Sequence, residues 1–100
     1  MENELFNDPE FRELIKSYLD YLVETVQKLK SDLLDMEKMR KFGHDLKGTG
    51  SGYGYDDFTR LGGTLEKAAI DNKPNEVKKI FEDFESRLTE EQARFKVSLD

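Results

Sequence analysis

Cysteine is missing from this 100-residue sequence and histidine occurs only once, and both facts exclude classes of site. Without cysteine there is no disulfide framework, thiolate zinc centre or iron–sulfur cluster. A single histidine cannot supply the several ligands that a metal site needs, and the basic residues beside it repel a cation. We therefore expect neither a metal ion nor a cofactor to be held by this chain.

Long apolar runs and an excess of positive charge are also missing. No stretch is long and apolar enough to cross a membrane, and the start "MENELFNDPE" has neither the positive flank nor the apolar run of a signal peptide. The formal net charge of −6 argues against nucleic acid as the main partner, because phosphate backbones bind net basic surfaces. We expect a cytoplasmic protein that binds another protein.

The alternation typical of strands is missing too, and apolar residues recur at helical spacing nearly throughout. The spacing predicts one all-α domain over residues 1–100, with a first helix over residues 9–30 that is capped by Asp8. A second helix follows a cap at Asp35 and continues toward Tyr53. The connections are short, and short connections favour antiparallel neighbours, so we predict an antiparallel up-down-up-down four-helix bundle.

The later helices have their own start and stop signals. Asp56 or Asp57 is expected to cap the third helix, the proline of "DNKPN" to stop it, and Asn75 to open the fourth. The segment "TEEQ", residues 89–92, looks like a capping box, which predicts a kink or restart of the last helix there. The residues expected on the inward faces are Phe11, Leu14, Ile15, Tyr18, Leu22, Val26 and Leu29 in the first helix, Met36, Met39, Phe42 and Leu46 in the second, Phe58, Leu61, Leu65, Ala68 and Ala69 in the third, and Val77, Ile80, Phe81, Phe84, Leu88 and Phe95 in the fourth.

The only histidine lies in the glycine-rich stretch "GHDLKGTGSGYG", residues 43–54. With Leu46 at the middle of the buried face, His44 lies about 160° away from it on the helix and faces solvent. Asp45, although adjacent, points elsewhere and cannot easily orient the imidazole. The neighbours of His44 one turn to either side are Arg40, Lys41, Lys47, Gly48 and Ser51.

The glycines of this stretch divide into two groups. Gly43 and Gly50 lie on the inward side, where a missing side chain lets two helices approach closely. Gly48 lies on the exposed face, where nothing in this chain explains a helix penalty of roughly 1 kcal/mol. We expect Gly48 to leave the imidazole unshielded, and Gly52 and Gly54 to serve as ordinary residues of the helix end.

Other chemistries fit the stretch poorly. A phosphate-binding loop requires glycines before the lysine, whereas Lys47 precedes most of them. A hydrolytic Ser-His-Asp arrangement needs a buried, oriented imidazole, whereas His44 is expected on an open convex surface without a pocket. A neutral, exposed imidazole is a nucleophile that can accept a phosphoryl group, and Lys47 at i+3 and Arg40 at i−4 can place positive charge beside it.

The segments "HDLKGTGSGYG" and "LGGTLEKAA" together resemble the histidine-containing phosphotransfer (HPt) domain of phosphorelays. The family pattern is H-x-x-K-G, a small residue, a glycine ten positions after the histidine, and a later leucine-glutamate pair. The matching positions are His44, Lys47, Gly48, Thr49, Gly54, Leu65 and Glu66. The pattern is also similar to that of the phosphorylated domain of chemotaxis-type kinases.

The resemblance implies a phosphoryl carrier in a two-component regulatory system. His44 would accept a phosphoryl group on Nε2 from an aspartate of one response-regulator receiver domain and pass it to an aspartate of another. The chain would not be an enzyme by itself, since the receiver supplies the acidic pocket and the Mg²⁺ and the chain has no ATP-binding domain. The implied partners are receiver domains and a sensor or hybrid histidine kinase, and the implied state is a monomer.

The implied docking surface surrounds His44, with parts of the first helix alongside. Lys47 would stabilise the phosphate, and the partner would contact Arg40, Lys41, Gly48 and Ser51. The residues themselves give no role to Glu66 beyond a solvated helix face.

Two alternatives remain open. One is a helical interaction module that keeps the HPt shape without being phosphorylated, and the other is the amino-terminal phospho-accepting domain of a larger chemotaxis-type kinase. The initiating Met1 and the polar end "KVSLD" favour a free-standing chain over the second alternative.

Overall fold

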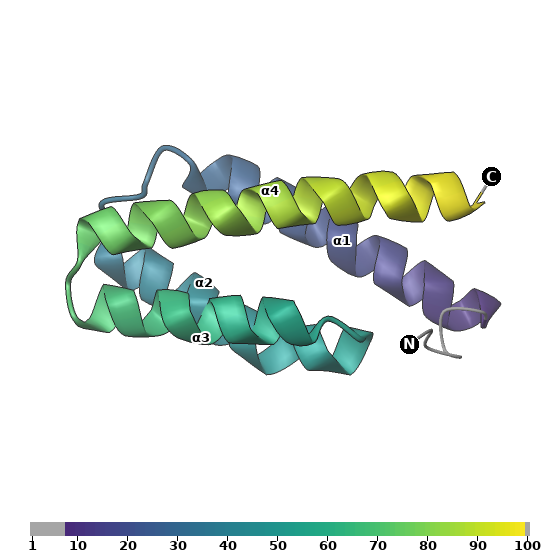
Figure 1. The fold of residues 1–100 in the computed structure, drawn as a ribbon, viewed down its shortest axis with the longest axis horizontal. Helices are drawn as coiled ribbons and strands as arrows, with labels where there is room; N and C mark the ends of the chain where they lie inside the picture. The colour runs from purple at the N-terminus through teal and green to yellow at the C-terminus, as the bar shows by residue number, and fades with distance from the viewer. Residues whose placement is uncertain (1–7, 100) are drawn as a thin grey trace.

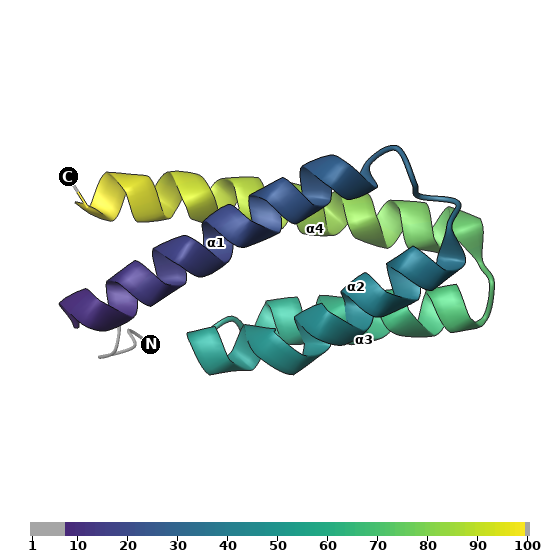
Figure 2. The same cartoon turned by 180° about the vertical axis from the view of Figure 1, so that it is seen from behind.

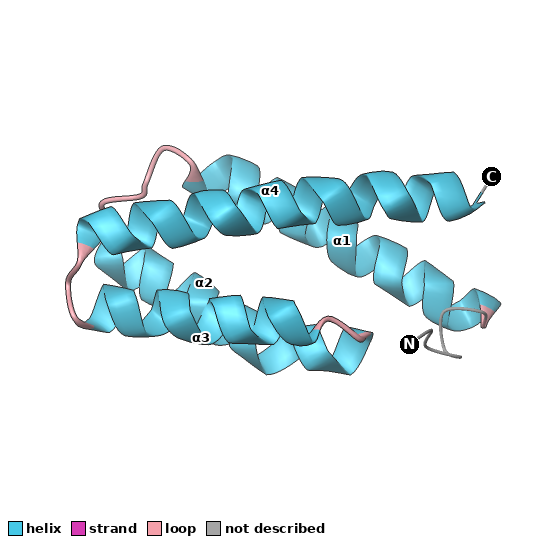
Figure 3. Cartoon of the chain, in the orientation of Figure 1, coloured by secondary structure: helices cyan, strands magenta, loops and turns pink. Residues whose placement is uncertain are grey.

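The computed structural model describes the backbone of residues 8–99 and the side chains of residues 8–95. These residues form four α-helices, namely α1 (Pro9–Leu29), α2 (Met36–Thr49), α3 (Asp56–Ile70) and α4 (Pro74–Leu99), and the 3-10 helix η2 (Gly50–Tyr53) follows α2 directly. Figure 3 shows helices and loops and no strand in this described part of the chain. The all-α prediction is therefore confirmed.

The first two helices begin where the sequence predicts. The side chain of Asp8 accepts hydrogen bonds from the backbone N–H groups of Glu10 and Phe11, and Pro9 occupies the first helical position. The side chain of Asp35 accepts from the N–H of Lys38 at 3.1 Å. Both carboxylates satisfy N–H groups that have no partner within the helix and add negative charge at the positive end of its dipole.

The predicted caps of the later helices need correction. Tyr55 is the N-cap of α3 and makes no capping bond with its side chain, so Asp56 and Asp57 belong to the first helical turn. The proline of "DNKPN" does not end α3, which stops at Ile70; it is the first residue of α4, where a missing N–H costs nothing.

The predicted restart near residue 89 does not occur, because α4 is continuous from Pro74 to Leu99. Instead of capping a new helix, the Thr89 hydroxyl donates to the Glu85 carbonyl one turn earlier. Leu88 and Glu91 on either side of it are buried, so the packed face of α4 extends through the capping-box sequence.

The four helices pack as two pairs that lie against each other. Helices α2 and α3 lie side by side, and α4 packs against both α3 and α1 (Figures 1 and 2). In both views α1 and α4 extend past the end of the α2–α3 pair where η2 lies.

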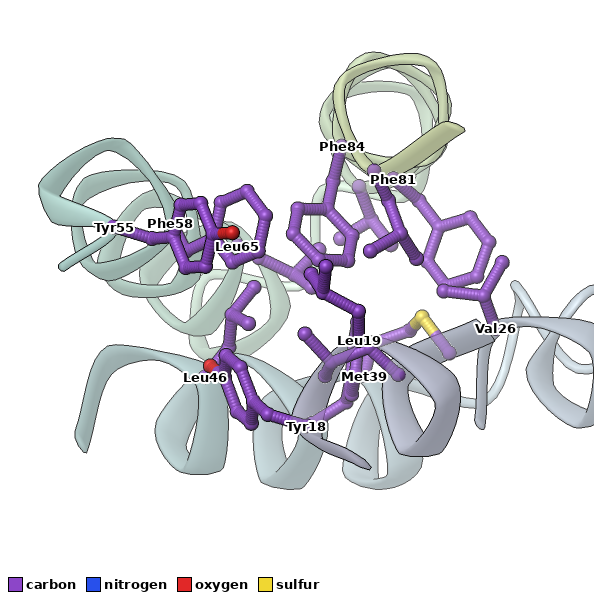
Figure 4. Packing of buried hydrophobic residues seen from close by; sticks show 14 of the residues in the cluster. Tyr18, Leu19, Val26, Met39, Leu46, Tyr55, Phe58, Leu65, Phe81 and Phe84 are labelled. Atoms are coloured by element: carbon purple, nitrogen blue, oxygen red, sulfur yellow. The ribbon is translucent and has the colours of Figure 1, made fainter. Parts of the chain in front are cut away.

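The core is a single cluster of buried side chains from all four helices and Tyr55. Figure 4 shows its aromatic centre, where Phe58 lies edge-on to Phe84 with ring centroids 5.1 Å apart and stacks on Tyr55 at 4.5 Å. Most residues predicted to face inward are buried or partly buried. Leu14 is an exception, since it is 56% exposed, and its place on α1 becomes important at the site described next.

Candidate functional site

His44 lies in the middle of α2 with its side chain 64% exposed, as its angular position around the helix predicts. Its imidazole is nevertheless held in place. The Nδ1 atom of His44 lies 2.9 Å from Oε2 of Glu66, on the neighbouring helix α3. The interpretation of Glu66 as a solvated surface residue is therefore wrong, because its side chain is only 14% exposed and contacts the histidine.

The same carboxylate also binds the lysine of the motif. Nζ of Lys47 lies 3.3 Å from Oε1 of Glu66, so one carboxylate bridges His44 and Lys47. The hydrogen bond with His44 is the largest influence on the pKa of Glu66, and together with Lys47 it lowers that pKa against the opposing effect of burial. Glu66 is therefore ionised at neutral pH.

Close packing of α2 on α3 places Glu66 within reach of His44. A Cβ atom on Gly43 would lie 2.6 Å from the backbone nitrogen of Glu66 and 2.8 Å from the carbonyl oxygen of Gly62. A Cβ atom on Gly62 would in turn lie 2.5 Å from the backbone nitrogen of Lys47. The two helices can approach this closely only because both positions lack a side chain, which confirms the packing role predicted for Gly43.

The contact with Glu66 selects one form of the histidine ring. An ionised carboxylate can only accept hydrogen bonds, so Nδ1 of His44 carries the proton and donates it to Glu66. In the neutral ring the lone pair then resides on Nε2, which is the nitrogen away from α3. In that neutral form the site presents the Nε2 lone pair, and in the positively charged form the Glu66 carboxylate balances the charge on the ring.

The remaining predicted site residues behave differently from one another. Arg40 is engaged by Glu37, with Nε and Nη2 at 3.0 and 2.6 Å from its carboxylate oxygens, and Lys41 is exposed. Ser51 donates its backbone N–H and its hydroxyl to Oγ1 of Thr59 on α3. Among the described side chains, Glu66 is hydrogen-bonded to His44 and Lys47 is linked to it through the same carboxylate.

The structure confirms most of what was predicted about which glycines near His44 are packed against another helix and which are exposed. A Cβ atom on Gly48 would meet nothing within 4 Å, and the same is true of Gly52. Gly50 is buried against α3, where a Cβ atom would lie 2.7 Å from the backbone nitrogen of Thr59. Gly54 ends η2 with φ of 89°, a left-handed conformation that glycine adopts without strain.

The prediction of an open convex surface without a pocket is wrong. A groove with a volume of about 560 Å³ lies between α1 and α2, and His44 forms part of its wall. Leu14 and Tyr21 of α1 line the groove and are 56% and 57% exposed. The residues lining it are Leu14, Ser17, Tyr18, Tyr21, Leu22, Phe42, His44, Asp45, Leu46, Gly48, Thr49 and Tyr53.

One side of the groove is formed by an ordered aromatic pair. The ring of Tyr18 stacks on that of Tyr53 with centroids 4.0 Å apart and planes 11° from parallel. The Thr49 hydroxyl donates to the carbonyl oxygen of Asp45, so its oxygen accepts from the Tyr18 hydroxyl at 2.8 Å. Burial raises the pKa of Tyr18, which therefore stays protonated and keeps donating at neutral pH.

A second polar cluster lies away from His44 and was not predicted. Glu91 of α4 is buried, accepts a hydrogen bond from the Tyr55 hydroxyl at 3.1 Å and pairs with Arg87 and Arg94. Arg87 also pairs with Asp57 in the first turn of α3. These hydrogen bonds and ion pairs connect the start of α3, next to the end of η2, with the second half of α4.

Comparisons with protein-family models, with curated proteins and with solved structures gave no match. Within the described residues, no helix is both long and apolar enough to pass through a membrane. The functional conclusion therefore depends on the residues and geometry around His44.

Proposed function

We propose that this chain is a histidine phosphotransfer protein, a cytoplasmic phosphoryl carrier between aspartates of response-regulator receiver domains in a phosphorelay. We assign its fold to the antiparallel up-down-up-down four-helix bundle, which the short connections at alternating ends of the helices support (Figures 1 and 2). The observation that carries the proposal is the exposed His44, whose Nδ1 is bonded to Glu66.

In the proposed reaction the Nε2 lone pair of His44 attacks the phosphorus of an aspartyl phosphate on the donor receiver. An N–P bond forms, the P–O bond to the aspartate breaks, and the aspartate leaves as a carboxylate. The Nδ1 proton stays on the ring, so the phosphorylated imidazole gains positive charge beside the Glu66 carboxylate. Transfer to a second receiver reverses these steps, with the acceptor aspartate attacking phosphorus and Nε2 leaving.

Two residues of this chain assist the reaction by electrostatics. Glu66 keeps the ring in the reactive tautomer and stabilises the positive charge that develops on it. Lys47 is 53% exposed and lies next to the imidazole, so its ammonium can leave Glu66 and contact the phosphoryl oxygens. Phosphoryl transfer depends mainly on positioning and on such charges, and the partner receiver would supply the acidic pocket and Mg²⁺.

Access to His44 is also consistent with a carrier. Gly48 follows His44 by one turn on the open side of α2, and among the described residues no side chain and no other helix lies within 4 Å of a Cβ atom built there. A larger side chain at that position would stand between the imidazole and the active site of a partner. The bare backbone therefore allows a receiver to close over Nε2.

The proposal is tested by phosphorylating a purified receiver domain with acetyl phosphate in Mg²⁺, adding this chain, and measuring intact mass under mildly basic conditions. We expect the chain to gain one phosphoryl group that is labile to acid and stable to base. Because His44 is the only histidine, His44→Gln should abolish the gain and leave helicity unchanged. If several unrelated receivers give no gain, or if the His44→Gln protein is labelled equally, the carrier function is wrong.

A further inference from the structure

Gly63 lies in the middle of α3, and close packing of the helices does not account for it. A glycine inside a helix is less favourable than an alanine. Its neighbour Gly62 has to be bare, because a Cβ atom there would lie 2.5 Å from the backbone nitrogen of Lys47. A Cβ atom on Gly63 would meet the neighbouring helix only at 3.5 Å or more, which is ordinary contact. Alanine would therefore fit at this position, and the missing side chain needs another reason.

The side chain of Lys47 lies against α3 at Gly63. Apart from the chain neighbours of Gly63 and the backbone of its own helix, the only described atoms within 4 Å of a Cβ atom there are Cδ and Cγ of Lys47, at 3.5 and 3.9 Å. Beyond this contact the side chain continues to Glu66, where Nζ lies 3.3 Å from Oε1. Lysine often packs its aliphatic stem on a surface while its charged end stays in water. Here that surface is the bare backbone at Gly63.

We propose that Gly63 is a positioning residue for phosphoryl transfer, because its bare backbone holds the stem of Lys47 where the ammonium lies beside His44. The proposal rests on the phosphotransfer function proposed above. A lysine stem that projects freely into water samples many rotamers, and a held stem has already lost most of that freedom. With Cγ and Cδ in place, rotation about the bonds beyond Cγ moves Nζ from Glu66 to a phosphoryl oxygen on His44.

Larger side chains at position 63 test this role. Gly63→Val and Gly63→Leu both fill the space beside the Cβ atom and should displace the Lys47 stem. Both residues have a better helix propensity than glycine, so the variants should melt at or above the wild-type temperature. Gly63→Ala is the matched control, because it gains helix propensity and places its only added carbon at an ordinary contact distance from Lys47.

The experiment loads His44 with phosphoramidate, a small phosphoryl donor, so that no partner protein has to dock. The Nε2 lone pair of His44 attacks phosphorus, an Nε2–P bond forms, and the protonated nitrogen of the donor leaves as ammonia with the electrons of the broken P–N bond. Intact mass under mildly basic conditions gives the rate of loading. We expect Gly63→Val and Gly63→Leu to load about threefold to fivefold more slowly than wild type, the size of one lost exposed charge contact. Gly63→Ala should load at the wild-type rate.

A double-mutant cycle separates positioning of Lys47 from a general disturbance of α3. If Gly63→Val acts by displacing the lysine, adding it to Lys47→Ala should slow loading no further. A general disturbance would slow loading in both backgrounds. The ε-methylene NMR signal of Lys47, assigned by its loss in Lys47→Ala, gives a second readout. We expect this signal to shift in Gly63→Val and to keep its position in Gly63→Ala.

The outcomes distinguish this proposal from the carrier function. The proposal is overturned if both larger variants load as fast as wild type, or if Gly63→Val slows loading equally in the Lys47→Ala protein. It is also overturned if the larger variants slow only transfer from a receiver domain, because position 63 would then serve docking. If Lys47→Ala loads at the wild-type rate, the lysine has no role at His44 and the proposal falls. If the expected loading rates are found and no receiver labels His44, the carrier function fails, whereas the placing of Lys47 by Gly63 is upheld.

Discussion

Adding a single methyl group to Gly43 tests whether close packing of α2 on α3 builds the site. In Gly43→Ala the new Cβ atom would lie 2.6 Å from the Glu66 nitrogen and 2.8 Å from the Gly62 oxygen, both backbone atoms that no side-chain rotation can move. Ordinary contact needs roughly 1 Å more, so α2 must move away from α3. Such overpacking lowers the free energy of unfolding by about 1–3 kcal/mol. The better helix propensity of alanine offsets about 1 kcal/mol of this loss.

Gly48→Ala is the matched control, because it makes the same substitution in the same helix with nothing within 4 Å of the new atom. It should stabilise the protein by up to about 1 kcal/mol. The propensity gain is common to both variants, so the difference between their free energies of unfolding isolates the packing cost of about 1–3 kcal/mol. Each kcal/mol corresponds to about 4–8 °C in Tm for a domain of this size.

Urea unfolding followed by far-UV circular dichroism measures both free energies. We expect Gly43→Ala to be the less stable variant and, because α2 shifts, to weaken the bond between Nδ1 of His44 and Glu66. That second effect is read as a change in the ¹⁵N shifts of the imidazole. Equal stabilities for the two variants, with unchanged imidazole shifts, would refute the argument that the helices meet through bare glycines.

Two further predictions concern the buried and bridging carboxylates. The pKa of Glu66 is lowered in the folded protein, so its contribution to stability is present above the ordinary value of 4.5 and is lost as pH falls through the folded value. Glu66→Gln should therefore lower Tm at pH 7, with a difference from wild type that shrinks below pH 4.5, and a difference independent of pH would contradict the ionised bridge. Glu91→Ala should lower the free energy of unfolding by about 3 kcal/mol, because it removes the buried carboxylate that accepts from the Tyr55 hydroxyl and pairs with the Arg87 guanidinium. The control Glu90→Ala changes an exposed residue, so its free energy of unfolding should stay within about 0.5 kcal/mol of wild type. Equal losses of stability for Glu90→Ala and Glu91→Ala in thermal or urea unfolding would show that the Glu91 cluster adds no stability.

Features set by the order of residues within one helix could be predicted from the sequence. The period of apolar residues places His44 on the exposed face, and the caps at Asp8 and Asp35 follow from residue type and position. The exposure of Gly48 and the burial of Gly43 follow from their angular positions around the same helix. These are local properties, determined by the fixed angle between successive residues of a helix.

Features that depend on which helix lies opposite could not be predicted in this way. Glu66 is 22 residues from His44, and only the approach of α3 to α2 turns an apparently solvated carboxylate into a partner for the imidazole. Leu14 has the spacing of a core residue but is exposed, because no element among the described residues covers α1 on the side of the groove. The capping-box sequence at Thr89 stays helical because burial of Leu88 and Glu91 outweighs a local signal.

The most direct test of the central claim is a long-range ¹H–¹⁵N correlation spectrum of the histidine-labelled protein, recorded before and after incubation with a phosphorylated receiver domain. Because the chain has only one histidine, every imidazole signal belongs to His44. We predict that Nδ1 carries the proton before the reaction, and that Nε2 shows coupling to phosphorus after it. A spectrum without phosphorus coupling, or with phosphorus on Nδ1, would contradict the claim that Glu66 prepares Nε2 of His44 to carry the phosphoryl group.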